Sequence, residues 1–181
     1  MNANALEATI AAIRSDWGPL STEIVSAGRR HLTDLLKASP SEEWLSALHR
    51  EEPANRELYR DPEYGFVLLA HTEHAGLYRS PHDHGRGWVI YAIQRGEIEM
   101  RTYARIENPD GGVKLVQRDS TLVRPGRVQV YLPGDIHDTR CVSGPALLFR
   151  FTERDLKRED KVEHRVTRYI ERDGAWTVES P

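Results

Sequence analysis

Apolar residues recur at helical spacing in the N-terminal part of the chain. In residues 3–14 and again in residues 21–37 they fall three or four positions apart, which places them on one face of an α-helix. The predicted buried residues are Leu6, Ile10 and Ile13 in the first helix, and Ile24, Val25, Leu32, Leu35 and Leu36 in the second. Gly18-Pro19 separates the two segments. A third, short helix is predicted to open at Ser39-Pro40-Ser41-Glu42, with Ser39 as the N-cap and Glu42 completing a capping box.

After Pro53 the pattern changes to short runs of β-branched and aromatic residues separated by turn residues. The predicted strands cover residues 66–70, 88–93, 98–103, 113–116, 128–132 and 146–152. Asn-Pro-Asp-Gly-Gly at 108–112 is a strong turn signal. Several short strands with no helices between them predict an antiparallel all-β core, a sandwich or a barrel, with the N-terminal helices packed outside it.

The C-terminal tail holds a charged segment at 153–161, a predicted strand at 162–171, a turn at 172–174 and a last strand at 176–178. A chain of 181 residues without repeats or a long linker is expected to form one domain. We expect helices in 1–58, the barrel in 59–152 and a hairpin in 153–181. This hairpin either caps a barrel edge or crosses to a second copy in a homodimer.

Composition narrows the function classes. The 25 basic and 28 acidic residues nearly balance, which argues against a nucleic-acid partner or an anionic membrane surface. No apolar run approaches the roughly 18 residues of a membrane span, and residues 1–13 lack the features of a signal peptide. The single cysteine, Cys141, excludes an internal disulfide and a cysteine-based zinc site. A cytoplasmic protein is the expectation.

Three histidines carry the candidate chemistry. His82 and His84 lie one residue apart, directly before the apolar run 88–93, so strand alternation would point both to the same side. Two imidazoles on one face can bind a metal ion, which rarely binds well with fewer than three protein ligands. The best third ligand is His137, in the segment Tyr-Leu-Pro-Gly-Asp-Ile-His. The sequence therefore predicts a three-histidine metal site inside the β core.

These residues stand in frames that resemble the two motifs of the cupin superfamily. Gly76 precedes the His-x-His pair, and Gly96 follows it, at the spacing of the first motif; Gly126 and Gly134-x-x-His137 resemble the second. The resemblance covers residues 64–152 and implies a double-stranded β-helix, or jelly-roll barrel, in which the histidines converge. The glutamate that most metal cupins add is Val89 here, and the usual asparagine after the third histidine is Cys141.

Without the glutamate, three neutral imidazoles would leave the full +2 charge of a bound ion, which favours an anionic ligand such as a thiolate. This ligand set resembles the cysteine dioxygenase and related thiol dioxygenase family. The resemblance implies Fe(II), O2 and a small thiol carboxylate, of the cysteine or 3-mercaptopropionate type, oxidised to the sulfinic acid. Imidazoles also accept Zn, Mn or Ni.

The resemblance also suggests substrate contacts. Arg60, in a Tyr-x-Arg-like element ahead of the barrel, is the predicted partner of the substrate carboxylate, because a guanidinium can donate two parallel hydrogen bonds. The family's late Ser-His-Tyr set falls at Leu148, Arg150 and Thr152, so Arg150 becomes a second candidate for anion binding. Tyr91 shares the face of Val89 and is the candidate to hydrogen-bond a bound oxygen species.

Other readings stay open. The same site could serve a metal-dependent isomerase, cyclase or non-thiol oxygenase, or a non-catalytic cupin that binds an anion. His71 and His74 imitate a metal pair, but strand alternation would place them on opposite faces. Asp83 is expected to point away from the metal and to support the site from behind.

Overall fold

The computed structural model describes residues 3–109, 112–172 and 174–178 of the chain. Residues 110 and 111 of the predicted 108–112 turn and residue 173 of the predicted 172–174 turn lie outside the described residues. Among the described residues, no helix combines the length and the apolar character that crossing a bilayer requires.

The three predicted N-terminal helices are present: α1 (Ala5–Ser15), α2 (Thr22–Leu35) and α3 (Glu43–Glu51). Asn4 caps α1 in a capping box with Glu7, and Ser21 caps α2. The predicted start of α3 at Ser39 was wrong. The observed N-cap is Glu42, three residues later. The Glu42 carboxylate accepts the indole N–H of Trp44 and the backbone N–H of Ala5 instead of closing a capping box.

The all-β core follows the prediction with differences at the strand ends. The strands are β1 (Arg56–Arg60), β2 (Val67–Glu73), β3 (Tyr78–His82), β4 (Val89–Glu107), β5 (Val113–Val123), β6 (Val128–Tyr131) and β7 (Ile136–Thr152). The predicted strands 88–93 and 98–103 are one continuous strand, β4. β1 and β3 were not predicted as strands.

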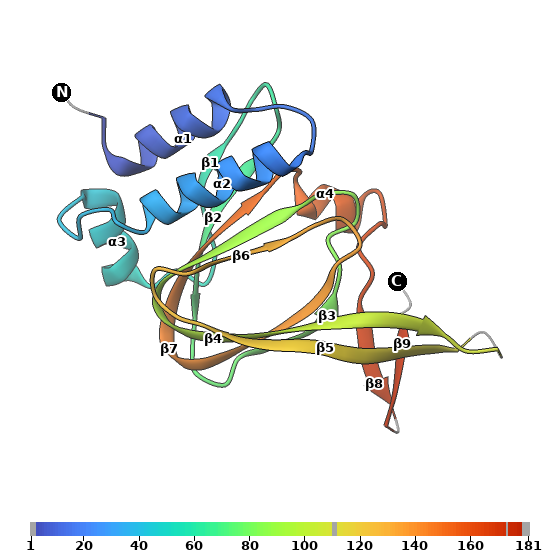
Figure 1. The fold of residues 1–181 in the computed structure, drawn as a ribbon. Coiled ribbons are helices and arrows are strands. Elements are labelled where there is room, and N and C mark those ends of the chain that lie inside the picture. Colours follow the sequence, from blue (N-terminus) through green and yellow to red (C-terminus); the bar gives the residue numbers. More distant parts are fainter. Residues whose placement is uncertain (1–2, 110–111, 173, 179–181) are drawn as a thin grey trace.

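β4 and β7 each run through both halves of one antiparallel seven-stranded sheet. The first part of β4 and the last part of β7 join β1, β2 and β6 in what we call the helix-side half. The remaining parts of the same two strands join β3 and β5 in the hairpin-side half. Figure 1 shows the two halves folded over one another, with β4 and β7 passing from one to the other. The pairings leave the sheet open between the described strands, so the expected closed barrel is replaced by a folded sheet.

Glycine permits the sharp bend between the halves. Gly96 has φ +77°, and a Cβ there would lie 2.6 Å from the Cβ of Ala146 and from the carbonyl oxygen of Ser143. The register of β4 against β7 shifts on both sides of this glycine. The two strands can therefore cross closely here and change direction together.

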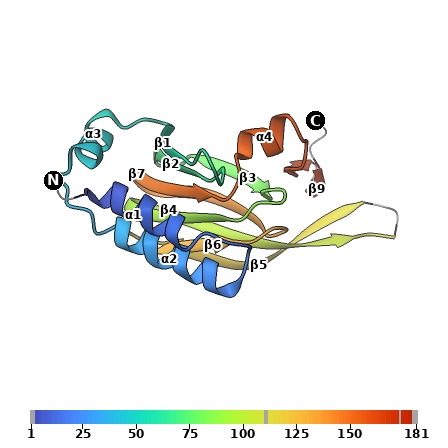
Figure 2. The ribbon, with the colours of Figure 1, turned by 90° about the horizontal axis from the view of Figure 1, so that it is seen from above.

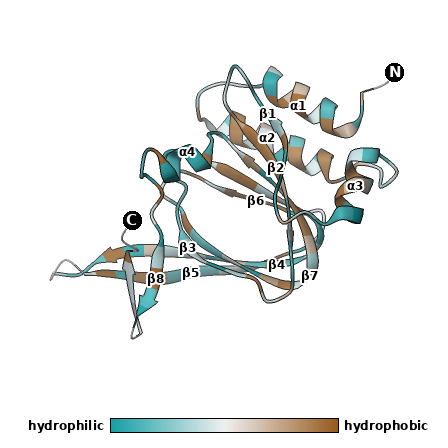
Figure 3. Ribbon diagram, turned by 180° about the vertical axis from the view of Figure 1, so that it is seen from behind, coloured by the Kyte–Doolittle hydropathy of each residue, from teal (hydrophilic) through white to brown (hydrophobic). Residues whose placement is uncertain are grey.

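The helices cover the outer face of the helix-side half. Figure 3 shows apolar residues on the sides of α1, α2 and α3 that face the strands. The buried apolar cluster between helices and strands includes Ile13, Leu32, Leu35, Leu45, Leu48, Leu68, Trp88, Ile90, Phe149 and Phe151. Of the predicted helical stripes, Ile13, Ile24, Leu32 and Leu35 lie in this core, and Leu6, Val25 and Leu36 pack partly buried against it. Ile10 is only partly buried. Burial of such side chains contributes about 1.5–3 kcal/mol each.

The C-terminal segment forms a helix and a hairpin at the other end of the molecule (Figure 2). The charged stretch contains α4 (Leu156–Lys161), and the hairpin is β8 (Tyr169–Arg172) with β9 (Ala175–Val178). The strand predicted over 162–171 was therefore too long, because residues 162–168 pack as an irregular segment against the loop that follows β3. The hairpin adjoins β3 and β5, and the ring of Trp176 lies 6.1 Å from that of Tyr103.

Candidate metal centre

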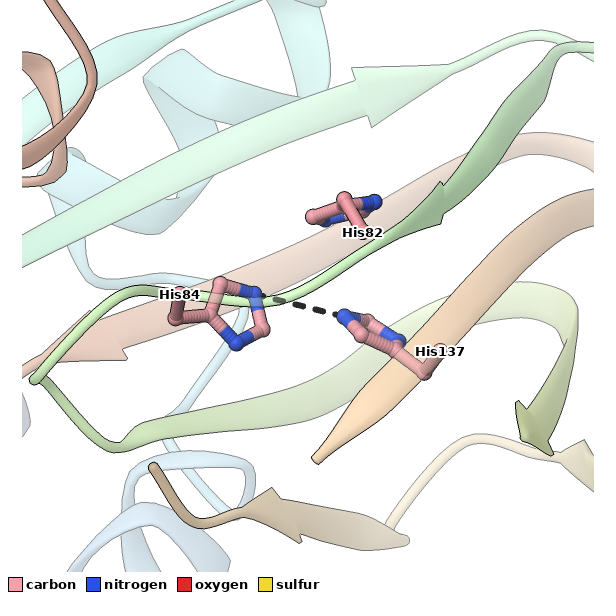
Figure 4. A group of neighbouring side chains, drawn as sticks. All are labelled: His82, His84 and His137. Atoms are coloured by element: carbon pink, nitrogen blue, oxygen red, sulfur yellow. Dashed lines mark hydrogen bonds between the residues drawn. The ribbon is translucent and has the colours of Figure 1, made fainter. Parts of the chain in front are cut away.

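The structure brings His82, His84 and His137 together in the space between the two sheet halves (Figure 4). His82 ends β3, His84 lies in the following loop, and His137 is the second residue of β7. The prediction that His82 and His84 share one strand was wrong, because the chain leaves β3 at Asp83. His82 on β3 and His84 in the loop nevertheless place their ring centroids 4.8 and 5.0 Å from that of His137.

The spacing of the three rings suits a single metal ion. Nε2 of His84 lies 3.3 Å from Nε2 of His137, and one ligand atom from each histidine lies within 4.8 Å of the others. Two nitrogens that each bind one ion at about 2.0–2.1 Å are separated by about 3.3 Å when the angle at the ion is near tetrahedral. A small inward movement of His82 would complete a set of three ligands.

The environment keeps all three imidazoles in the form that can bind a metal. Burial lowers the pKa of His82, and burial together with the neighbouring histidines lowers the pKa of His84 and of His137 well below the usual value. The three rings are therefore neutral at pH 7. His82 Nδ1 lies 2.8 Å from the carbonyl oxygen of Ser80, which favours a proton on Nδ1 and leaves Nε2 free as a ligand.

Two tyrosines enclose the histidines. The ring of Tyr131, which the sequence analysis did not single out, stacks on His137 with 3.8 Å between ring centroids. The Tyr91 hydroxyl lies 3.4 Å from Nε2 of His84, and its ring is 5.3 Å from that of His137. Tyr91 therefore reaches the centre, as its place in the alternation predicted. Burial raises the pKa of both phenols, so both keep their protons at neutral pH.

The loop that carries His84 is fastened to the C-terminal segment. One Asp83 carboxylate oxygen accepts the backbone N–H groups of Gly85 and Thr167, at 3.0 and 2.9 Å. The Arg86 guanidinium donates to the buried Glu159 at 3.0 Å and to Glu163. Asp83 thus supports the site without facing the histidines, as expected.

A buried carboxylate anchors the strand beside His137. Asp138 is fully buried and accepts hydrogen bonds from Arg101, Tyr103 and Tyr78, the last two at 2.7 and 3.1 Å. Four donors on one carboxylate compensate its removal from water. This cluster fixes the start of β7 and therefore the position of His137; the sequence gives no periodic signal for it.

No carboxylate or thiol joins the three histidines within the described part of the chain. Val89 is fully buried in the apolar cluster between the sheet halves. Cys141 is buried, and its Sγ donates to the backbone carbonyl of Glu73 at 3.3 Å. Burial raises the pKa of this thiol, which leaves it protonated and unreactive.

The two candidate arginines differ in their surroundings. Arg60 is exposed, and its guanidinium pairs with Glu57 and Asp155, both at 2.7 Å, at the rim of a hollow that also reaches His82 and His84. Arg150 lies on the inner face of β7, opposite Tyr91, and its Nε is buried without a hydrogen-bond partner. No salt bridge involves Arg150 among the described residues, so its charge is available to a ligand.

His71 and His74 do not form a metal pair, although His74 follows the end of β2 and strand alternation therefore does not extend to it. His74 is exposed, whereas His71 is buried and points into the interior, near the histidine centre but outside the ligand set. Burial lowers the pKa of His71 to about 3, and the Arg150 charge adds to this effect.

Comparisons with known proteins assign no family to the chain. No protein-family model and no curated protein matches the sequence. Among solved structures, KdgF from Halomonas sp. is 15% identical, with a TM-score of 0.43, and covers 54% of this chain and 74% of its own. The cupin domain of Cnp3 from Schizosaccharomyces pombe is 14% identical, with a TM-score of 0.44, and covers 59% and 69%.

A cupin superfamily protein from Desulfitobacterium hafniense is 15% identical, with a TM-score of 0.42, and covers 56% of this chain and 76% of its own. At such low identities and TM-scores, these likenesses assign neither an activity nor a ligand to the chain. The resemblance to thiol dioxygenases stays a prediction.

Proposed function

We propose that this protein is a metal-dependent enzyme of the cupin type that acts on a small anionic substrate at the three-histidine centre. The observation that supports this most directly is the approach of His84 and His137, whose Nε2 atoms lie 3.3 Å apart in a buried, neutral site. The Nδ1 atoms of His84 and His137 are buried without a hydrogen-bond partner among the described residues. Burying such polar groups costs free energy, and a bound cation would compensate part of that cost.

The finer proposal is an Fe(II)-dependent thiol dioxygenase. An Fe(II) ion in this site would supply a redox-active centre with positions left open for a thiolate and O2. The overall reaction adds both atoms of O2 to the sulfur of the thiol and yields a sulfinic acid. The lack of an acidic ligand supports this choice, because an uncompensated divalent charge favours a thiolate.

The residues of the chain would orient the substrate and exclude water. Arg150 faces the interior with its charge unpaired and is the group we assign to the substrate carboxylate. Arg60, our first choice from the sequence, is held by two carboxylates at the rim, which leaves it a role at the entrance. Tyr91 is placed to donate a hydrogen bond to a ligand at the centre, while Tyr131 shields His137.

A metal-dependent reaction without redox chemistry is the alternative. Arg150 occupies the position at which the thiol dioxygenase pattern has its histidine, and this difference favours a changed reaction. Zinc, manganese or nickel in the same site would act as a Lewis acid in an isomerisation or cyclisation.

Metal analysis and oxygen uptake test the proposal together. Protein loaded anaerobically with Fe(II) is expected to hold one ion per chain and to consume O2 with 3-mercaptopropionate or cysteine. His137→Ala should lose both properties, whereas His74→Ala, which changes an exposed histidine outside the site, should keep them. If the protein binds one ion per chain but consumes no O2, the proposed metal site stands and the dioxygenase proposal is wrong. If the folded wild-type protein binds no metal, both the metal-site proposal and the dioxygenase proposal are wrong.

A further inference from the structure

A polar cavity extends from the histidine centre toward the bend in the sheet. Its volume is about 360 Å³, and both sheet halves line it. His82 and Tyr91 lie at the end near the centre, and Glu73, Arg79 and Thr139 lie further along. The cavity is therefore continuous with the site and larger than a three-carbon thiol acid requires.

Four buried polar atoms on its wall have no hydrogen-bond partner among the described residues: His71 Nε2, Glu73 Oε2, Thr139 Oγ1 and Arg150 Nε. The three residues other than Arg150 are nearly inaccessible, with exposed fractions of 8%, 3% and 4%. A buried polar atom left unpaired costs about 1–3 kcal/mol. Four in one cavity indicate a place built to receive polar groups.

The hydrogen-bonding character of these atoms specifies what they would bind. Glu73 Oε1 accepts from Arg79 at 2.9 Å, so its free Oε2 is an acceptor that lacks a donor. His71 Nδ1 lies 3.2 Å from the carbonyl oxygen of Ala54, which places the proton on Nδ1 and leaves Nε2 as a second acceptor. Arg150, in contrast, can only donate and carries a positive charge.

Charge balance in the cavity favours an anion overall. The Arg79 charge is matched by Glu73, and Arg168 pairs with Asp160 through two contacts of 2.5 and 3.0 Å. Arg150 has no such partner among the described residues. The ligand must therefore bring an anionic group for Arg150 together with a hydrogen-bond donor for the acceptors.

We infer that Glu73, with His71 and Thr139, forms a specificity subsite that selects acids carrying a hydroxyl or ammonium group over the same acids without one. This inference rests on the proposed function, because it places the ligand's other end at the histidine centre. Glu73 and Thr139 act on the choice of substrate, and not on the metal.

The selectivity follows from the cost of burying unpaired acceptors. An acid with a donor satisfies Glu73 Oε2, whereas an acid without one leaves it dry and unpaired or traps a water. Hydrogen bonds to charged groups are strong enough that we expect at least a tenfold preference.

Matched thiol acids of two lengths test the subsite in binding experiments on anaerobic, Fe(II)-loaded protein, where no turnover occurs. The first pair is 3-mercaptopropionate and cysteine, which differ only in the amino group. The second set is 4-mercaptobutanoate, homocysteine and 2-hydroxy-4-mercaptobutanoate, which separates ammonium from hydroxyl. Calorimetry should show a donor-bearing acid binding at least about tenfold more tightly than its bare counterpart in at least one set.

Two variants connect the preference to the subsite. Glu73→Gln and Thr139→Val should each reduce the ratio of affinities between the donor-bearing acid and the bare acid. Glu73→Gln should bring this ratio close to one. The affinity for the bare acid should change little in either variant. Glu43→Gln, an exposed glutamate of α3, is the matched control and should keep the full preference. Metal content and thermal unfolding verify that each variant is folded. If Glu73→Gln fails to fold because the Glu73–Arg79 ion pair is lost, Thr139→Val alone tests the subsite.

The outcomes separate the two proposals. Equal binding of all acids within each set, or an unchanged preference in both variants, overturns the subsite but leaves the metal-dependent function standing. Metal-loaded protein that binds none of the acids overturns the anionic-substrate proposal and the subsite with it. A preference that disappears in the variants supports both.

Discussion

The two faces of β2, β4 and β7 in the helix-side half are made by alternate residues of the same strands and differ in the polar residues that they carry. On the outer face Leu68, Ile90 and Phe149 pack against the helices in a dry apolar layer. On the inner face His71, Tyr91 and Arg150 line the space that holds the histidine centre. The outer face is mainly apolar, whereas the inner face combines apolar residues such as Val89 with most of the buried polar atoms that lack partners.

This difference shows where the chain tolerates unfavourable burial. Buried polar atoms without partners are costly, and native structures contain few of them. Here half of those found among the described residues gather in the cavity beside His82, and two others belong to His84 and His137 themselves. The apolar layer under the helices supplies the stability that allows the inner face to remain unsatisfied.

Neighbouring residues of β7 provide the strongest test of the two-face comparison. Phe149→Ala is expected to reduce the free energy of unfolding by about 3–5 kcal/mol, because the ring is fully buried against Trp44 and leaves a dry cavity. Leu148→Ala should cost less, about 2 kcal/mol, because it enlarges a polar cavity that water can fill. Urea unfolding of both variants measures the difference. A cost for Leu148→Ala equal to that for Phe149→Ala would remove the distinction between the faces.

Acid sensitivity is the second test. The folded state holds the pKa of His71 at about 3, below the unfolded value, so the unfolded chain binds a proton that the folded chain refuses. Stability from this residue is therefore fully present above about pH 6.5 and decreases as the pH falls toward 3. Between neutral pH and pH 5 it should lose about 2 kcal/mol.

His71→Gln isolates this contribution from that of the histidine centre. The variant should lose less stability than the wild type between pH 7 and pH 5, when unfolding is measured on metal-free protein. His74→Gln changes an exposed histidine and should follow the wild type. Identical pH profiles for wild type and His71→Gln would contradict the burial of a neutral imidazole.

A small effect of opposite sign completes the comparison. Thr72 lies on the outer face, where its buried hydroxyl has no partner among the described residues. Thr72→Val keeps the shape and removes the unpaired group, so we expect a gain of about 1 kcal/mol in the free energy of unfolding. Thermal unfolding measures it, with metal content and ligand binding unchanged. A loss of more than about 1 kcal/mol would indicate that the hydroxyl binds a structural water.

The fold was predictable where buried apolar residues recur in the sequence at the period of a helix or a strand. The stripes of α1 and α2 and the apolar runs of β2, β4 and β7 gave the helices, the main strands and the antiparallel core. β1 and β3 were not predicted, because Arg56–Arg60 and Tyr78–His82 are half-exposed and lack an apolar alternation. The continuity of β4 through Gly96 was also hidden, because a glycine in a strand usually signals a turn.

The histidine cluster was predictable because its motif frames fix the spacing, although the local geometry of His84 was not. The sequence favoured Arg60 over Arg150 as the substrate contact. Only the fold shows that Glu57 and Asp155 pair with Arg60, and that no salt bridge among the described residues involves Arg150. Glu73 and Thr139 come from distant strands, so their convergence in one cavity depends entirely on tertiary structure.

The shared strands β4 and β7 also determine how molecules reach the interior. Because β4 and β7 continue from one half into the other, the two halves cannot separate without breaking the backbone hydrogen bonds between these strands. One opening to the interior lies at the rim, where Arg60 and residues of α4 border the hollow near His82. Side chains and a short helix thus border this opening, while the pairing of β4 with β7 holds the two halves of the folded sheet together.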